Sequence, residues 1–144
     1  MTIANVLAGK GSQVLTIRSD QNLAAAIRIL HEGRIGALVV VDRRGKLVGM
    51  LSERDLVRAV AEQGAKALET EVDAFMTPDV TTCALEDRID KVMMIMTVHR
   101  IRHLPVMDRG RIVGLVSIGD LVKHRLDEKE IEANVLLDIA RAHP

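Results

Sequence analysis

Aromatic residues are almost missing from this 144-residue sequence, which has no tryptophan, no tyrosine and a single phenylalanine, Phe75. Proteins that bind single-stranded nucleic acid stack the bases on aromatic side chains, so a stacking platform of that kind is excluded. An excess of one charge is also missing, because 20 lysines and arginines balance 20 aspartates and glutamates. A general polyanion-binding protein would carry a basic excess. Nucleic acid is therefore not an expected partner, and any bound base must lie between aliphatic side chains.

Cysteine and long apolar runs are equally scarce. Cys83 is the only cysteine, so no disulfide can form within the chain, which fits a reducing compartment. No stretch approaches the roughly 18 consecutive apolar residues of a membrane span, and the N-terminus lacks the charged and apolar regions of a signal peptide. We therefore expect a cytoplasmic protein without a membrane partner. Apolar residues, at 48%, suffice for a substantial core.

Signatures of catalysis and of metal binding are missing too. The histidines are scattered without the spacing of metal ligands: His31, His99, His103, His124 and His143. There is no glycine-rich phosphate loop, no nucleophile elbow and no pair of carboxylates arranged for acid–base catalysis. We expect neither a metal site nor an enzyme.

One short motif does occur, and it occurs twice. Residues 49–55 (Gly-Met-Leu-Ser-Glu-Arg-Asp) and 114–120 (Gly-Leu-Val-Ser-Ile-Gly-Asp) each join the end of an apolar strand to a Ser-x-x-Asp helix start. A serine at the helix N-cap and an aspartate three residues later form a capping box. The same turn presents free N–H groups at the positive end of the helix dipole, a geometry that binds phosphate. The motif therefore predicts either a helix cap or a ligand site.

The sequence around the motif repeats as well. The apolar helical positions Leu23, Ala26, Ile27 and Leu30 recur as Ile89, Val92, Met93 and Met96, and the apolar run 38–41 recurs at 104–107. We predict an α/β (α+β) fold with two copies of a β-α-β-β-α unit. Asp20 is expected to cap the first long helix and Gly33 to end it. Each unit is too small to bury its sheet alone, so the two should pack face to face.

The duplicated unit divides the chain into five parts. We expect an N-terminal helix over 1–12, a first repeat over 13–62, a linker over 63–76, a second repeat over 77–126 and a helical tail over 127–144. Apolar residues continue along one side of the tail at Ile131, Val135 and Ile139. The tail is expected to pack on a partner subunit or back across the N-terminal helix.

The repeated order and the paired motifs resemble a tandem pair of cystathionine-β-synthase-type (CBS) domains, also called a Bateman module. Val14 and Thr16 in the first repeat, and Met76-Thr77-Pro78 and residues 102–106 for the second, add to the match. The resemblance covers about residues 12–126. It implies a stand-alone regulatory module that binds an adenosyl ligand between its repeats. AMP is the first choice, with ADP, ATP, NAD(H) or S-adenosylmethionine as the others. The resemblance also implies a homodimer and a regulated partner protein that the sequence does not identify.

The resemblance assigns the sugar and phosphate contacts to the repeated motif. Asp120 and Asp55 would accept the ribose hydroxyls, whereas the alternative is helix capping alone. Ser117 and Ser52 would donate to phosphate or ribose. The backbone N–H groups behind them would assist, namely those of Ile118, Gly119, Glu53 and Arg54.

The two sites are expected to differ. Arg102 and His103 stand where the family places phosphate-binding basic groups, with a surface arginine and a strand-edge histidine as the alternative. The first repeat has Gly36 and Ala37 at these positions, so Arg54, Arg34 or Arg18 would have to substitute. The site of Asp120 is therefore the better candidate.

The adenine base would be met by residues at the strand starts. Thr16 and Thr82, with their neighbours Ile17 and Cys83, would contact the base edge through backbone groups. The apolar walls would come from Ile35, Ala37, Ile101 and Pro105. The alternative for all of these is simple core packing.

Three functions remain open at this point. The first is a sensor of energy or redox state that changes shape when an adenosyl ligand binds. The second is a dimeric interaction scaffold without ligand sensing. The third is a nucleotide-phosphate hydrolase that uses His103 and Asp120, for which no metal ligands are visible.

Overall fold

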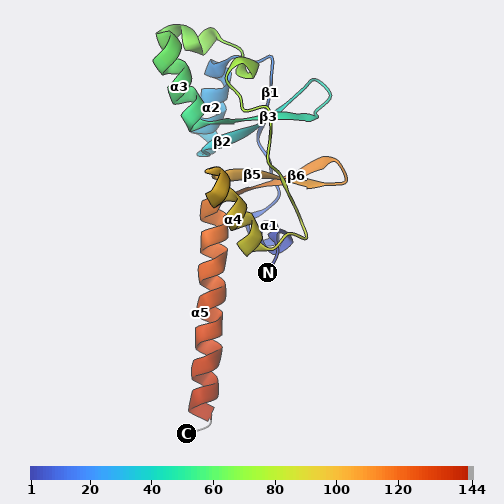
Figure 1. Ribbon diagram of the computed structural model, residues 1–144, viewed down its shortest axis with the longest axis vertical. Coiled ribbons are helices and arrows are strands. Elements are labelled where there is room, and N and C mark those ends of the chain that lie inside the picture. The colour runs from blue at the N-terminus through green and yellow to red at the C-terminus, as the bar shows by residue number, and fades with distance from the viewer. Residues whose placement is uncertain (143–144) are drawn as a thin grey trace.

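The structure, a computed structural model, describes residues 1–142 and contains the β-α-β-β-α unit twice (Figure 1). The first repeat comprises β1 (Thr16–Arg18), α2 (Leu23–Gly33), β2 (Ala37–Val41), β3 (Leu47–Ser52) and α3 (Glu53–Gln63). Two short 3-10 helices, η1 (Gly64–Glu69) and η2 (Val72–Ala74), connect it to the second. The second repeat comprises β4 (Cys83–Ala84), α4 (Ile89–His99), β5 (His103–Asp108), β6 (Arg111–Ser117) and α5 (Ile118–Ala142). Helix α1 (Ile3–Lys10) precedes both.

Each repeat forms its own three-stranded sheet with the same topology. The middle strand pairs in parallel with the short first strand and antiparallel with the third, in the orders β1-β2-β3 and β4-β5-β6. The register of both antiparallel pairs shifts at equivalent places, between Val40 and Val41 and between Val106 and Met107. The predicted mixed α+β class and the duplication are thus confirmed.

Two apolar clusters fill the molecule, one in each repeat. Strand β2 is buried along its whole length, as its β-branched apolar run predicts. The connector belongs to the first cluster, because Ala67, Val72 and Phe75 are buried in it. Helix α1 belongs to the second cluster through Ile3, Val6 and Leu7. The chain on either side of the first repeat is therefore part of the packed body.

The predicted cap of α2 is wrong. Asn22, not Asp20, is the N-cap, and its side chain accepts a hydrogen bond from the N–H of Ala25 at 2.9 Å. Asp20 instead accepts two hydrogen bonds from the Arg18 guanidinium. Aspartate and asparagine are both good N-cap residues. Asn22 takes the cap because the carboxylate of Asp20 is bound by Arg18. The helix ends at Gly33 as expected, with Arg34 in the left-handed conformation after it.

The segment that leads into each repeat packs on the other repeat. Leu7 of α1 covers Gly114 of β6, where an added Cβ would lie 2.7 Å from Leu7 Cδ1. Met76 covers the equivalent Gly49 of β3, where a Cβ would lie 2.6 Å from the Met76 sulfur. Thr77 forms a two-hydrogen-bond bridge with Met50 beside it. The repeats are therefore held together by exchanged segments.

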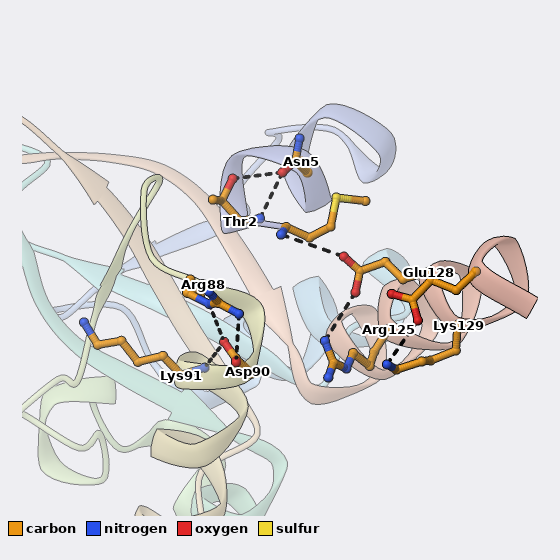
Figure 2. A network of polar contacts seen from close by, with 10 residues as sticks. Thr2, Asn5, Arg88, Asp90, Lys91, Arg125, Glu128 and Lys129 are labelled. Carbon is orange, nitrogen blue, oxygen red and sulfur yellow. Dashed lines mark hydrogen bonds and ion pairs between the residues drawn. The ribbon is translucent and has the colours of Figure 1, made fainter. Parts of the chain in front are cut away.

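Helix α5 projects far beyond the second repeat (Figure 1). Its base is tied to the N-terminus, since the Met1 amine lies 3.8 Å from Glu128, which also accepts from Arg125 (Figure 2). From Lys129 to Ala142 every residue is exposed. The predicted helical tail is confirmed as a helix to residue 142, while residues 143–144, including His143, lie outside the described range. The described ion pairs between α5 and the N-terminal region lie near its base, at Asp120 and Glu128. Among residues 1–142, no helix is long and apolar enough to cross a membrane.

Candidate functional site

Both repeated motifs fold into capping boxes at the start of a helix. Asp55 Oδ2 accepts the Ser52 N–H at 2.9 Å, and the Asp55 N–H donates to the Ser52 hydroxyl at 3.4 Å. Asp120 Oδ2 accepts the Ser117 N–H at 2.9 Å, and the Asp120 N–H donates to the Ser117 hydroxyl at 3.1 Å. The capping alternative is therefore realised at both positions. In each box the capping bonds to the carboxylate use Oδ2, while Oδ1 accepts from Arg58 in Asp55 and from none of residues 1–142 in Asp120.

Each helix start is bonded to the beginning of the middle strand of its own repeat. The Glu53 N–H donates to the Gly36 carbonyl at 3.1 Å, and the Ile118 N–H donates to the Arg102 carbonyl at 2.8 Å. These two amides therefore already have acceptors. The next amides, of Arg54 and Gly119, lie in the first helical turn, where intrahelical acceptors are lacking.

A lysine that no motif indicated lies on the Asp120 carboxylate. The Lys10 ammonium, at the end of α1, is 2.5 Å from Asp120 Oδ2 and 2.8 Å from the Leu115 carbonyl oxygen. Partial burial alone raises the pKa of Asp120, but the hydrogen bonds from Lys10 and from Ser117 outweigh it. The pKa of Asp120 therefore lies below its ordinary value, and the carboxyl is ionised at neutral pH. Sequence reasoning missed Lys10 because 110 positions separate it from its partner.

His103 lies at the junction of the two repeats. Its ring packs against Gly36 of the first repeat. A Cβ added at Gly36 would lie 3.3 Å from His103 Cε1 and 3.8 Å from the Glu53 carboxyl carbon. Burial lowers the pKa of His103, and the positive charge of Lys10 lowers it further. The negative charge of Asp120 acts in the opposite direction but does not outweigh them. The structure thus brings together the predicted residues Glu53, His103 and Asp120, from both repeats, and adds Lys10 to them.

Two equivalent cavities open where α2 and α4 end and the middle strands begin. One, of about 620 Å³, is lined by Ile35 and Glu53, with Leu30, His31, Glu32, Arg34 and Gly36. The other, of about 230 Å³, is lined by Ile101, Arg102 and Ile118, with Arg54, Met96, Thr97 and Arg100. Six of the predicted site residues thus line these two cavities, namely Ile35, Glu53, Arg54, Ile101, Arg102 and Ile118. Three of them, Ile35, Ile101 and Arg102, lie just before the middle strands.

Thr16 lies apart from both cavities. It lines a third cavity, of about 600 Å³, between the leading segment of the first repeat and the tips of the two β-hairpins. The basic residues of that cavity are Arg44, Lys46 and Arg111. The structure therefore separates Thr16 from Ile35, which sequence reasoning placed around the same base.

Several predicted wall residues belong to the core. The side chains of Ile17, Ala37, Cys83 and Pro105 are buried, whereas Thr82 is exposed just before β4. Burial raises the pKa of the Cys83 thiol to about 12, with a smaller contribution from Asp87. The thiol contacts the Pro105 carbonyl oxygen at 3.8 Å. A redox role for Cys83 is thus not favoured.

Within residues 1–142 no three histidine, cysteine or acidic side chains come together in an arrangement that would hold a metal ion.

Comparison with known proteins finds the same unit twice. The CBS domain model matches residues 11–62 and again residues 71–127. The CBS domain-containing protein CBSX3, mitochondrial, of Arabidopsis thaliana is 33% identical over 139 residues, which cover 91% of this chain and 68% of that protein. The Bacillus subtilis protein YhcV is 29% identical over 118 residues, 82% of this chain and 83% of that one.

Solved structures of similar proteins share the arrangement over most of this chain. The CBS-domain protein ATU1752 of Agrobacterium tumefaciens superposes with a TM-score of 0.84 at 44% identity, covering 86% of this chain and 92% of that one. The CBS domain pair of MJ0100 superposes with a TM-score of 0.79 at 26% identity, covering 89% and 98% of the two chains. That pair was solved in complex with 5′-methylthioadenosine and S-adenosyl-L-methionine.

Proposed function

Because the chain belongs to the CBS-domain family, we propose that it is a regulatory module that binds an adenosine-containing small molecule between its repeats. The adenosine ligands of the similar MJ0100 pair support this class of ligand. We propose AMP as the first ligand to test, then ADP, ATP and NAD(H), and we assign the chain no catalytic activity. Its single buried thiol fits the reducing cytoplasm in which we expect it.

The observation that carries the proposal is the position of Asp120. Its carboxylate is ionised, stands at a helix start and lies close to His103 at the junction of the repeats. Oδ1 of Asp120 accepts no hydrogen bond from residues 1–142. A carboxylate placed in this way accepts the hydroxyls of a ribose, as acidic residues do in dinucleotide-binding folds.

We propose further that the two sites are unequal. The second repeat supplies His103 near Asp120 and Arg102 in the adjoining cavity, and both can donate to a phosphate. The equivalent positions of the first repeat, Gly36 and Ala37, have no side-chain donors. A phosphorylated ligand should therefore bind the Asp120 site first.

Calorimetric titration with AMP, ATP, NADH and S-adenosylmethionine tests the proposal directly. We compare Asp120→Asn with Asp55→Asn, because an asparagine side-chain oxygen can still accept the capping N–H while the negative charge is lost. The expected result is one dominant site that Asp120→Asn weakens at least tenfold and Asp55→Asn leaves nearly unchanged. Mass spectrometry of small molecules released from the purified protein identifies what it carries from the cell. No binding of any of the four compounds at millimolar concentration would refute the proposal.

A second candidate, the dimeric scaffold, is favoured by the exposed apolar side chains of α5. Ile131, Val135 and Ile139 are all more than half exposed on the projecting part of the helix. Unpartnered apolar surface of this kind is typical of an interaction site. Ile131→Glu with Val135→Glu should abolish dimerisation, measured by light scattering, and leave ligand binding intact if scaffolding is the function. Deletion of residues 127–144 should do the same. If the variants lose ligand binding together with dimerisation, the two properties depend on each other, and a scaffold function without ligand sensing is refuted.

A further inference from the structure

Lys10 pairs with the carboxylate of one helix start from the exchanged segment, whereas the other carboxylate, Asp55, pairs with Arg58 of its own helix at 3.4 Å. The Lys10 ammonium lies 2.5 Å from Asp120 Oδ2 and 2.8 Å from the Leu115 carbonyl oxygen. Leu7 covers Gly114, and Met76 covers the equivalent Gly49. Three residues after Leu7 the chain has Lys10, whereas three residues after Met76 it has Asp79. The exchanged segments are therefore equivalent in packing but opposite in charge at this position.

The ammonium competes with a ribose for the same carboxylate. Asp120 Oδ2 accepts from Lys10 and also from the Ser117 N–H at 2.9 Å, so two donors fill the two lone pairs of this oxygen. A ribose that donates both hydroxyls to the two carboxylate oxygens must take the place of Lys10 on Oδ2. Ligand binding at Asp120 thus requires the Lys10 side chain to move.

The rest of α1 keeps Lys10 beside the site when its ammonium moves. Ile3 and Val6 are buried in the core of the second repeat, and Leu7 packs on Gly114. The Lys10 side chain itself is 36% exposed on a flexible four-carbon stem. The displaced ammonium therefore stays within reach of a ligand held by Asp120.

We propose that Lys10 sets the charge of the ligand at the Asp120 site, so that the site selects adenosine compounds that carry a phosphate. An uncharged nucleoside must separate Lys10 from Asp120 and offers the ammonium no new anion. A phosphate replaces the carboxylate as the partner of the ammonium. A cationic sulfonium ligand instead meets Lys10 and Arg102, which have the same charge. This inference rests on the proposed adenosine-binding function and narrows its ligand class.

The test compares adenosine with AMP on wild-type protein and on Lys10→Met, by calorimetric titration. Methionine keeps most of the length of the stem and removes the charge. In the wild type, AMP should bind at least tenfold more tightly than adenosine. In Lys10→Met, adenosine should bind about 3- to 10-fold more tightly, which corresponds to loss of a partly exposed competing ion pair. The preference for AMP over adenosine should fall about tenfold.

Two further variants separate charge from structure. Lys10→Arg keeps the cation and should keep the preference for AMP. Lys129→Met removes a lysine that pairs with Glu132 on the projecting part of α5, and it should change neither affinity. Methylthioadenosine and S-adenosylmethionine serve as a second ligand pair, and Lys10→Met should strengthen the binding of both.

The outcomes distinguish the inference from the function on which it rests. If the wild type binds adenosine compounds but Lys10→Met has the same preference for AMP, the inference is overturned and the proposed function stands. If neither the wild type nor Lys10→Met binds adenosine, AMP, methylthioadenosine or S-adenosylmethionine, the proposed function is refuted and the inference falls with it. If only Lys10→Met binds adenosine, Lys10 is supported as a built-in competitor of the ligand.

Discussion

Alanine at Gly49 should destabilise the protein more than alanine at Gly114, although the two glycines are equivalent in the repeats. A Cβ at Gly49 would lie 2.6 Å from the Met76 sulfur and 3.1 Å from the Thr77 carbonyl oxygen. A Cβ at Gly114 would lie 2.7 and 2.8 Å from the two Cδ atoms of Leu7. The difference is that the three nearest atoms include a backbone oxygen at Gly49, whereas at Gly114 all three belong to the flexible Leu7 side chain.

The backbone next to Gly49 has little freedom to move away. Thr77 donates to the Met50 carbonyl at 2.8 Å and accepts from the Met50 N–H at 3.0 Å, so a shift of Thr77 weakens both bonds. Overpacking of a core costs about 1–3 kcal/mol, and the loss of glycine flexibility in the unfolded chain returns about 0.5 kcal/mol. We expect a loss of about 2 kcal/mol for Gly49→Ala and about 1 kcal/mol for Gly114→Ala.

Urea unfolding followed by circular dichroism measures these losses, because the chain lacks tryptophan and tyrosine for fluorescence. Gly9→Ala is the matched control, since its Cβ meets nothing within 4 Å and alanine favours its helix. Adding Leu7→Val to Gly114→Ala should recover most of the loss, because the crowding methyl groups retreat. Adding Met76→Ala to Gly49→Ala should recover less, since Thr77 remains. If Gly49→Ala is as stable as Gly9→Ala, or more stable than Gly114→Ala, the close approach of the exchanged segments is refuted.

Two further predictions concern titratable groups. Asp120→Asn should cost about 1 kcal/mol at pH 7, from the lost ion pair and helix-dipole interaction. Because the pKa of Asp120 is lowered in the folded protein, its stabilising effect is present above the unfolded pKa and is lost as the pH falls through the folded value. The stability difference between the wild type and Asp120→Asn should therefore shrink as the pH falls below the ordinary carboxyl pKa, in urea titrations at several pH values; a difference that does not shrink contradicts the assignment. Cys83, with a pKa of about 12 and a buried side chain, should react with a thiol reagent at pH 8 only after unfolding, and rapid reaction of the native protein would contradict its burial.

Features encoded within a few neighbouring residues could be predicted from the sequence. The capping boxes of Ser52 and Ser117 need only residues three positions apart, and the buried strand β2 needs only its own apolar run. The choice between Asp20 and Asn22 as the cap of α2 failed even at this range. It depends on whether Arg18 engages the aspartate, which the spacing of residues does not reveal.

Features that depend on distant contacts could not be predicted. Lys10 has no motif, and it meets Asp120 only because α1 packs on the second repeat instead of the first. The contact of Gly36 with His103 likewise joins residues of different repeats. The sequence therefore named Asp120 as a candidate residue and did not reveal the lysine that pairs with it.

Asp120 stands in the first turn of a helix that is 25 residues long. At 1.5 Å per residue this helix measures about 37 Å, so a tilt of about 5° at its base displaces the far end by about 3 Å. Helix α5 therefore has the geometry of a lever, with Asp120 near its pivot. A small change in the position of its first turn becomes a displacement of several ångströms at the exposed end.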